Sequence, residues 1–242
     1  MTNGVRFFSV GPLSLLAIII IIGLAILIIP LFLLGLIGDA FTRLGFSWIE
    51  AIAVVLLMVF GSMINIPVYH VRRDIVRVAH DTVQGYGIEA GAAPIWETVV
   101  SVNLGGAVIP VCVAAYLLSK AIIVTGESLL VPVTAGVLLV SGISYFSTRA
   151  VAGVGIRVPL VIPGVTALLA GALLTGGTGV SAVMVAIVSG VTGILLGGNL
   201  ARMSGIRDLE VPVVSIGGAG TFGAVFLCCI LPALLAYTGI YG

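Results

Sequence analysis

Charged side chains are rare in this chain, and they fall at intervals that match the thickness of a lipid bilayer. Its 242 residues include ten basic and nine acidic ones. A helix rises about 1.5 Å per residue, so roughly 20 apolar residues cross a hydrocarbon core of about 30 Å. Six uncharged stretches reach that length: 7–38, 51–71, 98–119, 128–148, 158–201 and 211–242. This spacing predicts a polytopic helical membrane protein.

The composition supports the same class and excludes others. Hydrophobic residues make up 60% of the chain and charged residues 8%, whereas a soluble domain has about 25% charged residues. The net charge of +1 and the lack of a basic run argue against a nucleic-acid partner. Cys112, Cys228 and Cys229 lie inside apolar stretches, which favours packing over a disulfide or a metal site. No cofactor is predicted.

The uncharged stretches predict seven spans, because 158–201 is twice the length of one. It breaks at 175–179, a Gly-rich run that favours a turn. The first run, 12–37, is too long for a signal peptide and lacks a cleavage site, so we expect it to be retained. The fold class predicted is an all-α integral membrane protein, one polytopic domain over 1–242. The spans are 12–37, 47–68, 98–119, 128–148, 158–175, 180–200 and 211–238, the last with a Gly-rich start open to unwinding.

The arginines predict the orientation of these spans. Eight lie at the N-terminus or in even-numbered loops, against Arg43 and Lys120 on the other side. Cytoplasmic loops are enriched in Lys and Arg. The N-terminus is therefore predicted to be cytoplasmic and the C-terminus external, in a multi-pass protein of the cytoplasmic (plasma) membrane. The eight are Arg6, Arg72, Arg73, Arg77, Arg149, Arg157, Arg202 and Arg207.

The one long loop, 69–97, is predicted to lie at the cytoplasmic interface. Apolar residues recur at helical spacing between Val71 and Val83, and the arginines take other faces. This pattern favours an amphipathic helix lying against anionic headgroups. The β-branched content leaves a short hairpin open as the alternative.

Polar residues gather in the cytoplasmic half of the predicted bundle. Backbone loosened by Gly or Pro at membrane depth must be buried in protein or line a wet cavity. Such loosened backbone, grouped with Asn and Arg side chains, is what an inward-facing binding site needs. Helix packing is the alternative, since small and polar residues also join helices, as in Gly193-x-x-x-Gly197. Arg157 could hold an anion or, more commonly, reach headgroups. The predicted substrate-binding residues are Asn65, Asn103, Arg157, Asn199, Gly217, Gly218, Gly220 and Thr221.

One motif is excluded by its context. Gly218-x-Gly220-x-x-Gly223 matches the dinucleotide-binding fingerprint letter for letter. That fingerprint needs a βαβ unit and an acidic residue about twenty positions later, and here an uncharged apolar run follows instead. The chain also lacks the common hydrolase and phosphate-loop motifs. No catalytic residue and no metal ligand is predicted.

Several segments resemble a prokaryotic family of multi-span membrane proteins with a domain of unknown function. They begin at Gly61 (GSMINIP), Val102 (VNLGGAVIP), Gly153 (GVGIRVP) and Ser215 (SIGGAGTF), and the likeness covers most of the chain from the second span onward. The family brings no established activity. Its members carry an aspartate where this chain has Asn199, and another where it has Gly223. Paired aspartates imply an aspartyl-type hydrolase or a proton-coupled site. If the family is catalytic, the resemblance implies that this chain, which has neither aspartate, is a pseudoenzyme.

The leading hypothesis is a membrane protein that binds or conducts a small solute or ion through a cytoplasm-facing polar cavity. The alternatives are a hydrolase-like protein without the paired aspartates and a non-catalytic assembly subunit. The lipid bilayer is the predicted partner, and both a homo-oligomer and other membrane subunits stay open.

Overall fold

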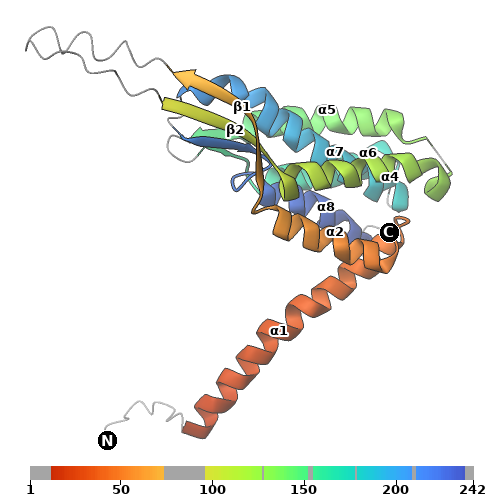
Figure 1. Cartoon of the computed structure of the whole chain (residues 1–242). Helices are drawn as coiled ribbons and strands as arrows, with labels where there is room; N and C mark the ends of the chain where they lie inside the picture. Colours follow the sequence, from red (N-terminus) through yellow and green to blue (C-terminus); the bar gives the residue numbers. More distant parts are fainter. Residues whose placement is uncertain are drawn as a thin grey trace, which may run out of the picture.

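The computed structural model describes residues 12–73, 96–126, 128–151, 155–177, 179–208 and 211–237, and most of them are helical (Figure 1). The α-helices are α1 (Pro12–Thr42), α2 (Trp48–Gly61), α4 (Ile109–Thr125), α5 (Leu130–Ser147), α6 (Val161–Leu174), α7 (Val180–Gly193) and α8 (Phe222–Tyr237). Two π-helical segments are η1 (Leu104–Val108) and η2 (Ile194–Asn199), and η3 (Leu200–Asp208) is a 3₁₀ helix. The strands are β1 (Asn65–Arg73), β2 (Trp96–Asn103), β3 (Arg149–Val151), β4 (Gly155–Arg157) and β5 (Val213–Ile216).

Helix α7 forms the centre of the bundle and contacts α4, α5, α6 and α8. All its residues from Ala182 to Val191 are buried, as expected for a helix that is apolar all round. The neighbouring helices approach it through glycines. A Cβ added at Gly193 would lie 2.7 Å from the Cβ of Val140 on α5. The predicted packing role of Gly193 is therefore confirmed.

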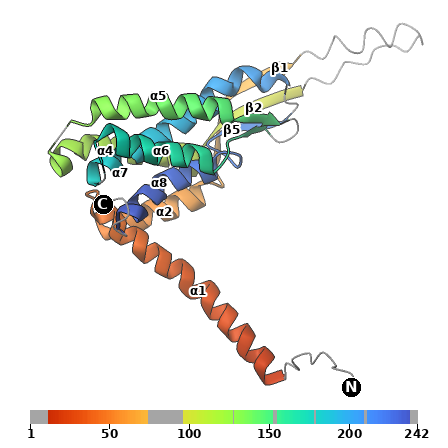
Figure 2. The ribbon, with the colours of Figure 1, turned by 180° about the vertical axis from the view of Figure 1, so that it is seen from behind.

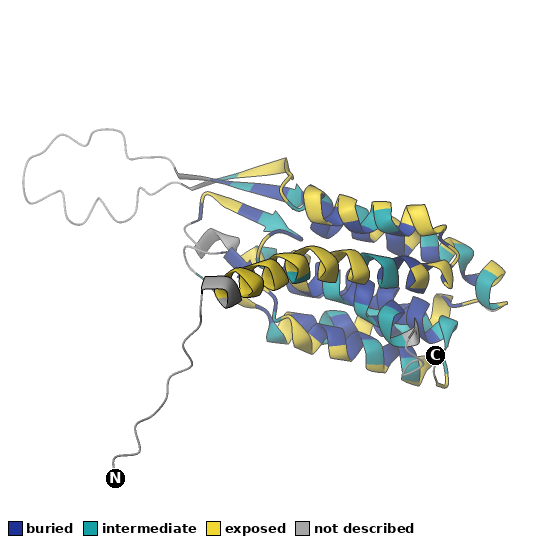
Figure 3. Cartoon of the chain, turned by 90° about the horizontal axis from the view of Figure 1, so that it is seen from below, coloured by how far each residue is buried: buried dark blue, intermediate teal, exposed yellow. Residues whose placement is uncertain are grey.

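Helix α1 leaves the bundle at an angle (Figures 1 and 2). Its side chains are exposed from Leu15 to Leu33 on nearly every face (Figure 3). Only its end is fixed, where Phe41 contacts Phe46 with ring centroids 5.5 Å apart. Phe46 in turn packs on Tyr116 of α4, whose hydroxyl donates to the carbonyl of Gly45 at 2.8 Å.

Among the described residues, four helices are long and apolar enough to cross a membrane, judged by length and composition: Leu15–Thr42, Leu104–Thr125, Leu130–Ser147 and Val180–Ser204. Three shorter apolar helices are Trp48–Gly61, Val161–Leu174 and Phe222–Leu235. Each predicted span therefore contains one apolar helix. The predicted break at 175–179 is confirmed, because α6 ends at Leu174 and α7 begins at Val180.

The predicted spans 47–68 and 98–119 are wrong in part, because each is helical over only part of its length. Residues 65–68 belong to β1 and residues 98–103 to β2. Valine and isoleucine are frequent in these strands, and β-branched side chains fit a pleated sheet well. The start of the last span is strand β5 and a Gly-rich turn, so its predicted unwinding is confirmed.

The amphipathic helix predicted in the loop 69–97 is wrong over the described residues 69–73, which extend β1. They pair antiparallel with β2, as in the hairpin that the sequence left open. The rest of the predicted helix lies outside the described residues. The prediction of a helix failed here because a short apolar repeat fits both the helical period of 3.6 residues and the strand period of two.

All the strands lie at one end of the helix bundle (Figure 2). Strand β2 is central in the order β1-β2-β5 and runs parallel to β5, with Val99 opposite Val213. Pro67 lies on edge strand β1, where a missing N–H donor is tolerated. Strands β3 and β4 form a separate antiparallel pair with Arg149 opposite Arg157.

Candidate functional site

Asn103 joins three elements where β2 ends and η1 begins. Its Nδ2 donates to the carbonyl of Ser62 at 2.7 Å and to Oδ1 of Asn65 at 3.0 Å. Its Oδ1 accepts from the backbone N–H of Gly106 at 2.8 Å and so caps η1. The side chain is 1% exposed, so these bonds satisfy groups that water cannot reach. Asn65 itself is exposed and also accepts from the hydroxyl of Ser215 at 2.5 Å.

Asn199 makes a second junction, at the end of η2. Its Oδ1 accepts from the N–H of Gly217 and from the hydroxyl of Thr221, both at 3.2 Å. The Gly217 N–H can only donate, which identifies the oxygen of this amide. Asn199 is fully buried, and its Nδ2 has no partner among the described residues. Asn199 therefore holds the turn between β5 and α8.

Glycines bring the two junctions into contact. A Cβ added at Gly106 would overlap the carbonyl oxygen of Gly217, and one added at Gly220 would overlap the carbonyl oxygen of Ile156. The carbonyl of Gly220 also accepts from the N–H of Val158 at 2.9 Å. Gly217 has a φ of +74°, a conformation that glycine adopts without strain. The turn before α8 is thus fixed between η1 and the segment after β4.

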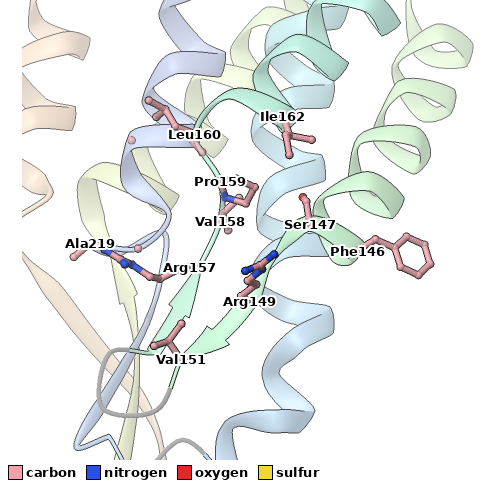
Figure 4. Close-up of a pocket in the computed structure, with 13 residues that line it drawn as sticks. Phe146, Ser147, Arg149, Val151, Arg157, Val158, Pro159, Leu160, Ile162 and Ala219 are labelled. Carbon is pink, nitrogen blue, oxygen red and sulfur yellow. The ribbon is translucent and has the colours of Figure 1, made fainter.

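A cavity of about 750 Å³ lies beside this turn (Figure 4). Ribbon β3–β4 and the starts of α6 and α8 form its walls, and the end of α5 forms its rim. A volume of this size is typical of a site for a small molecule. The lining residues used below are Phe146, Ser147, Arg149, Arg157, Leu160 and Ile162.

The cavity is electropositive. Arg149 and Arg157 are cross-strand neighbours on the ribbon, and both side chains are exposed. The described lining includes no carboxylate. Helices α6 and α8 both begin at this cavity without an acidic residue in the first turn, and helix N-termini carry partial positive charge. Like charges directly opposite each other destabilise a strand pair, so packing alone gives no reason for this arrangement.

The eight predicted binding residues fall into two groups. Arg157 and Gly220 line the cavity. Asn65, Asn103, Asn199, Gly217 and Thr221 take part in the hydrogen-bonded junctions, and Gly218 accepts from the N–H groups of Thr221 and Phe222 within the turn.

Sequence reasoning assigned Arg149 only to the charge balance and missed its place in the cavity. The sequence does contain a signal for this position. Arg149 and Arg157 are eight residues apart with a Gly-rich segment between them, and a hairpin centred on that segment would place the two arginines opposite each other.

Comparison with known proteins identifies a family and no relative of known function. A family model described as "Protein of unknown function (DUF1614)" matches residues 59–235, so the chain belongs to this family. The match includes both junctions and all the cavity-lining residues. Neither a curated protein nor a solved structure matches the chain.

Proposed function

We propose that this member of the family crosses a membrane seven times and binds a small anionic solute in the cavity, from the cytoplasmic side. The observation that carries the proposal is the pair of Arg149 and Arg157, held opposite each other in a cavity without a described carboxylate. The seven spans are the four long helices together with α2, α6 and α8.

The three shorter helices reach bilayer length only with the segments that follow or precede them. They have 14 to 16 residues, or about 21 to 24 Å. Helix α2 continues towards β1, and β4 and β5 precede α6 and α8. All of these strands lie at the arginine-rich end, so we assign that end to the cytoplasmic headgroup region.

Cysteine labelling tests the orientation. Ser128 lies between α4 and α5, Ala150 lies on β3, and both are exposed. The connection between α4 and α5 and the strands lie at opposite ends of the bundle (Figure 2). In a background without the native cysteines, Ser128→Cys is expected to react with a membrane-impermeant maleimide on intact cells. Ala150→Cys is expected to react only after permeabilisation. The reversed pattern would refute the orientation.

The arginine pair determines the expected ligand. A guanidinium presents a planar fork of donors that matches phosphate and carboxylate oxygens. The hydroxyl of Ser147 at the cavity rim donates to the carbonyl of Ile143 at 2.8 Å, so the two arginines, and not this hydroxyl, supply the side-chain donors for an anion. An anion in the cavity would separate the like charges of Arg149 and Arg157 and remove their repulsion.

Binding of inorganic phosphate to the detergent-purified protein tests this function. We expect Arg149→Gln and Arg157→Gln each to weaken phosphate binding by about tenfold or more, because one hydrogen bond to a charged group contributes about 1.5–3 kcal/mol. Arg43→Gln is the matched control, since Arg43 is exposed at the end of α1 and does not line the cavity. Equal affinities in calorimetry for the wild type and both cavity variants would refute an arginine-based site.

A further inference from the structure

The cavity joins a charged surface to an apolar one. Arg149 and Arg157 supply the charged surface, and Leu160 and Ile162 lie around the same space, while the ring of Phe146 at the rim points away from the arginines (Figure 4). These three apolar side chains are 82%, 50% and 49% exposed. A site for a fully water-soluble anion would not need an apolar rim. In a membrane, a rim of this kind faces acyl chains rather than water.

The apolar rim continues along α6 as a stripe. Ile162, Val165, Leu169 and Leu173 follow one another at spacings of three and four residues, which places them on one helix face. Val165, Leu169 and Leu173 are 46%, 55% and 77% exposed. From Ile162 to Leu173 the stripe is about 16 Å long, close to the ~15 Å of one leaflet.

We propose that the anion bound in the cavity is the phosphate of an anionic phospholipid from the cytoplasmic leaflet. This inference rests on the proposed function and names the ligand class of the same site. The phosphate oxygens accept hydrogen bonds from the guanidinium groups of Arg149 and Arg157. One acyl chain lies on the stripe of α6. The lipid enters sideways from the bilayer, past Phe146 and Leu160.

The geometry of the bilayer supports this occupant. The arginines lie at the end of the bundle that we assign to the cytoplasmic headgroups, and the stripe of α6 runs from there into the hydrocarbon core. The cytoplasmic leaflet carries the anionic lipids that attract basic side chains. A phospholipid therefore matches the charge, the rim and the stripe length together, whereas a soluble phosphate matches the charge alone.

Native mass spectrometry of the full-length protein tests the inference, with phosphatidylglycerol and phosphatidylcholine as probes. We expect phosphatidylglycerol to bind the wild type at least tenfold more tightly. Both lipids present phosphate oxygens to the arginines, but phosphatidylcholine also carries a choline cation, which the two guanidinium groups repel. In the double variant Arg149→Gln, Arg157→Gln this preference should disappear. Leu169→Ala should weaken phosphatidylglycerol binding about threefold through lost apolar contact, while Ile123→Ala, on an exposed position of α4, should not change it.

The outcomes separate this inference from the proposed function. If phosphatidylglycerol shows no preference over phosphatidylcholine, or if the double variant retains the preference, the lipid assignment is wrong. If inorganic phosphate still binds and depends on both arginines in that case, the anion site stands and its ligand is soluble. If neither phosphate nor phosphatidylglycerol binding depends on the arginines, the proposed function fails as well.

Discussion

Gly106→Ala is expected to lower the melting temperature of the detergent-purified protein by about 10 °C. The added Cβ would overlap the carbonyl oxygen of Gly217, and backbone on both sides leaves no flexible side chain to move aside. Overpacking of a well-packed core costs typically 1–3 kcal/mol, and we place this case at about 3 kcal/mol. For a chain of this length, each kcal/mol shifts the melting temperature by roughly 2–4 °C.

Gly142→Ala is the matched control for this prediction, and tryptophan fluorescence measures the melting temperature of both variants. Gly142 lies inside α5, and an added Cβ there meets no atom within 4 Å. Alanine favours a helix over glycine by up to about 1 kcal/mol, so the control should melt at the same temperature or slightly higher. A Gly106→Ala protein that melts within about 2 °C of the wild type would contradict the close approach of η1 to the turn before α8.

Asn103→Leu should destabilise the protein by a similar amount, about 3 kcal/mol, because it removes three hydrogen bonds at once. It leaves the buried N–H of Gly106 without its acceptor and the carbonyl of Ser62 without a donor. A buried polar group without a partner costs about 1–3 kcal/mol. The measurement is again thermal unfolding in detergent.

Asn65→Ala provides the comparison. Asn65 is exposed, so water can replace it as the partner of Asn103 and Ser215. We expect a loss of about 1 kcal/mol, the usual net value of one hydrogen bond. If Asn65→Ala and Asn103→Leu had equal effects, the position of Asn103 at the centre of the junction would be wrong.

The intervals between charges predicted the helices well. The length of an apolar run and the positions of the arginines that flank it are local properties, and they can be read directly from the sequence. The break between Leu174 and Val180 was predictable for the same local reason, a run of glycines. The length of an apolar run failed to predict the length of its helix only where the run changes its secondary structure part-way, as it does after Gly61 and before Leu104.

The site was predictable in part. Grouping polar residues by predicted side brought Asn65 and Asn103 together, and they are hydrogen-bonded. The cavity was not predictable, because it depends on the register that places Arg149 opposite Arg157 and on where α6 and α8 begin. Such tertiary placements follow from packing between segments that are distant in the chain.

The parallel pairing of β2 with β5 has a consequence for how the protein is made. Val99 pairs with Val213, so the segment between them, about half of the chain, must be synthesised before the central strand gains its second neighbour. Until then that edge of β2 keeps unpaired N–H and carbonyl groups, and the cavity lacks the wall formed by α8. In the proposed topology, the arginine-rich end is therefore completed only after the preceding helices have entered the bilayer. A chain truncated before β5 would lack α8 as well, and with it one wall of the cavity.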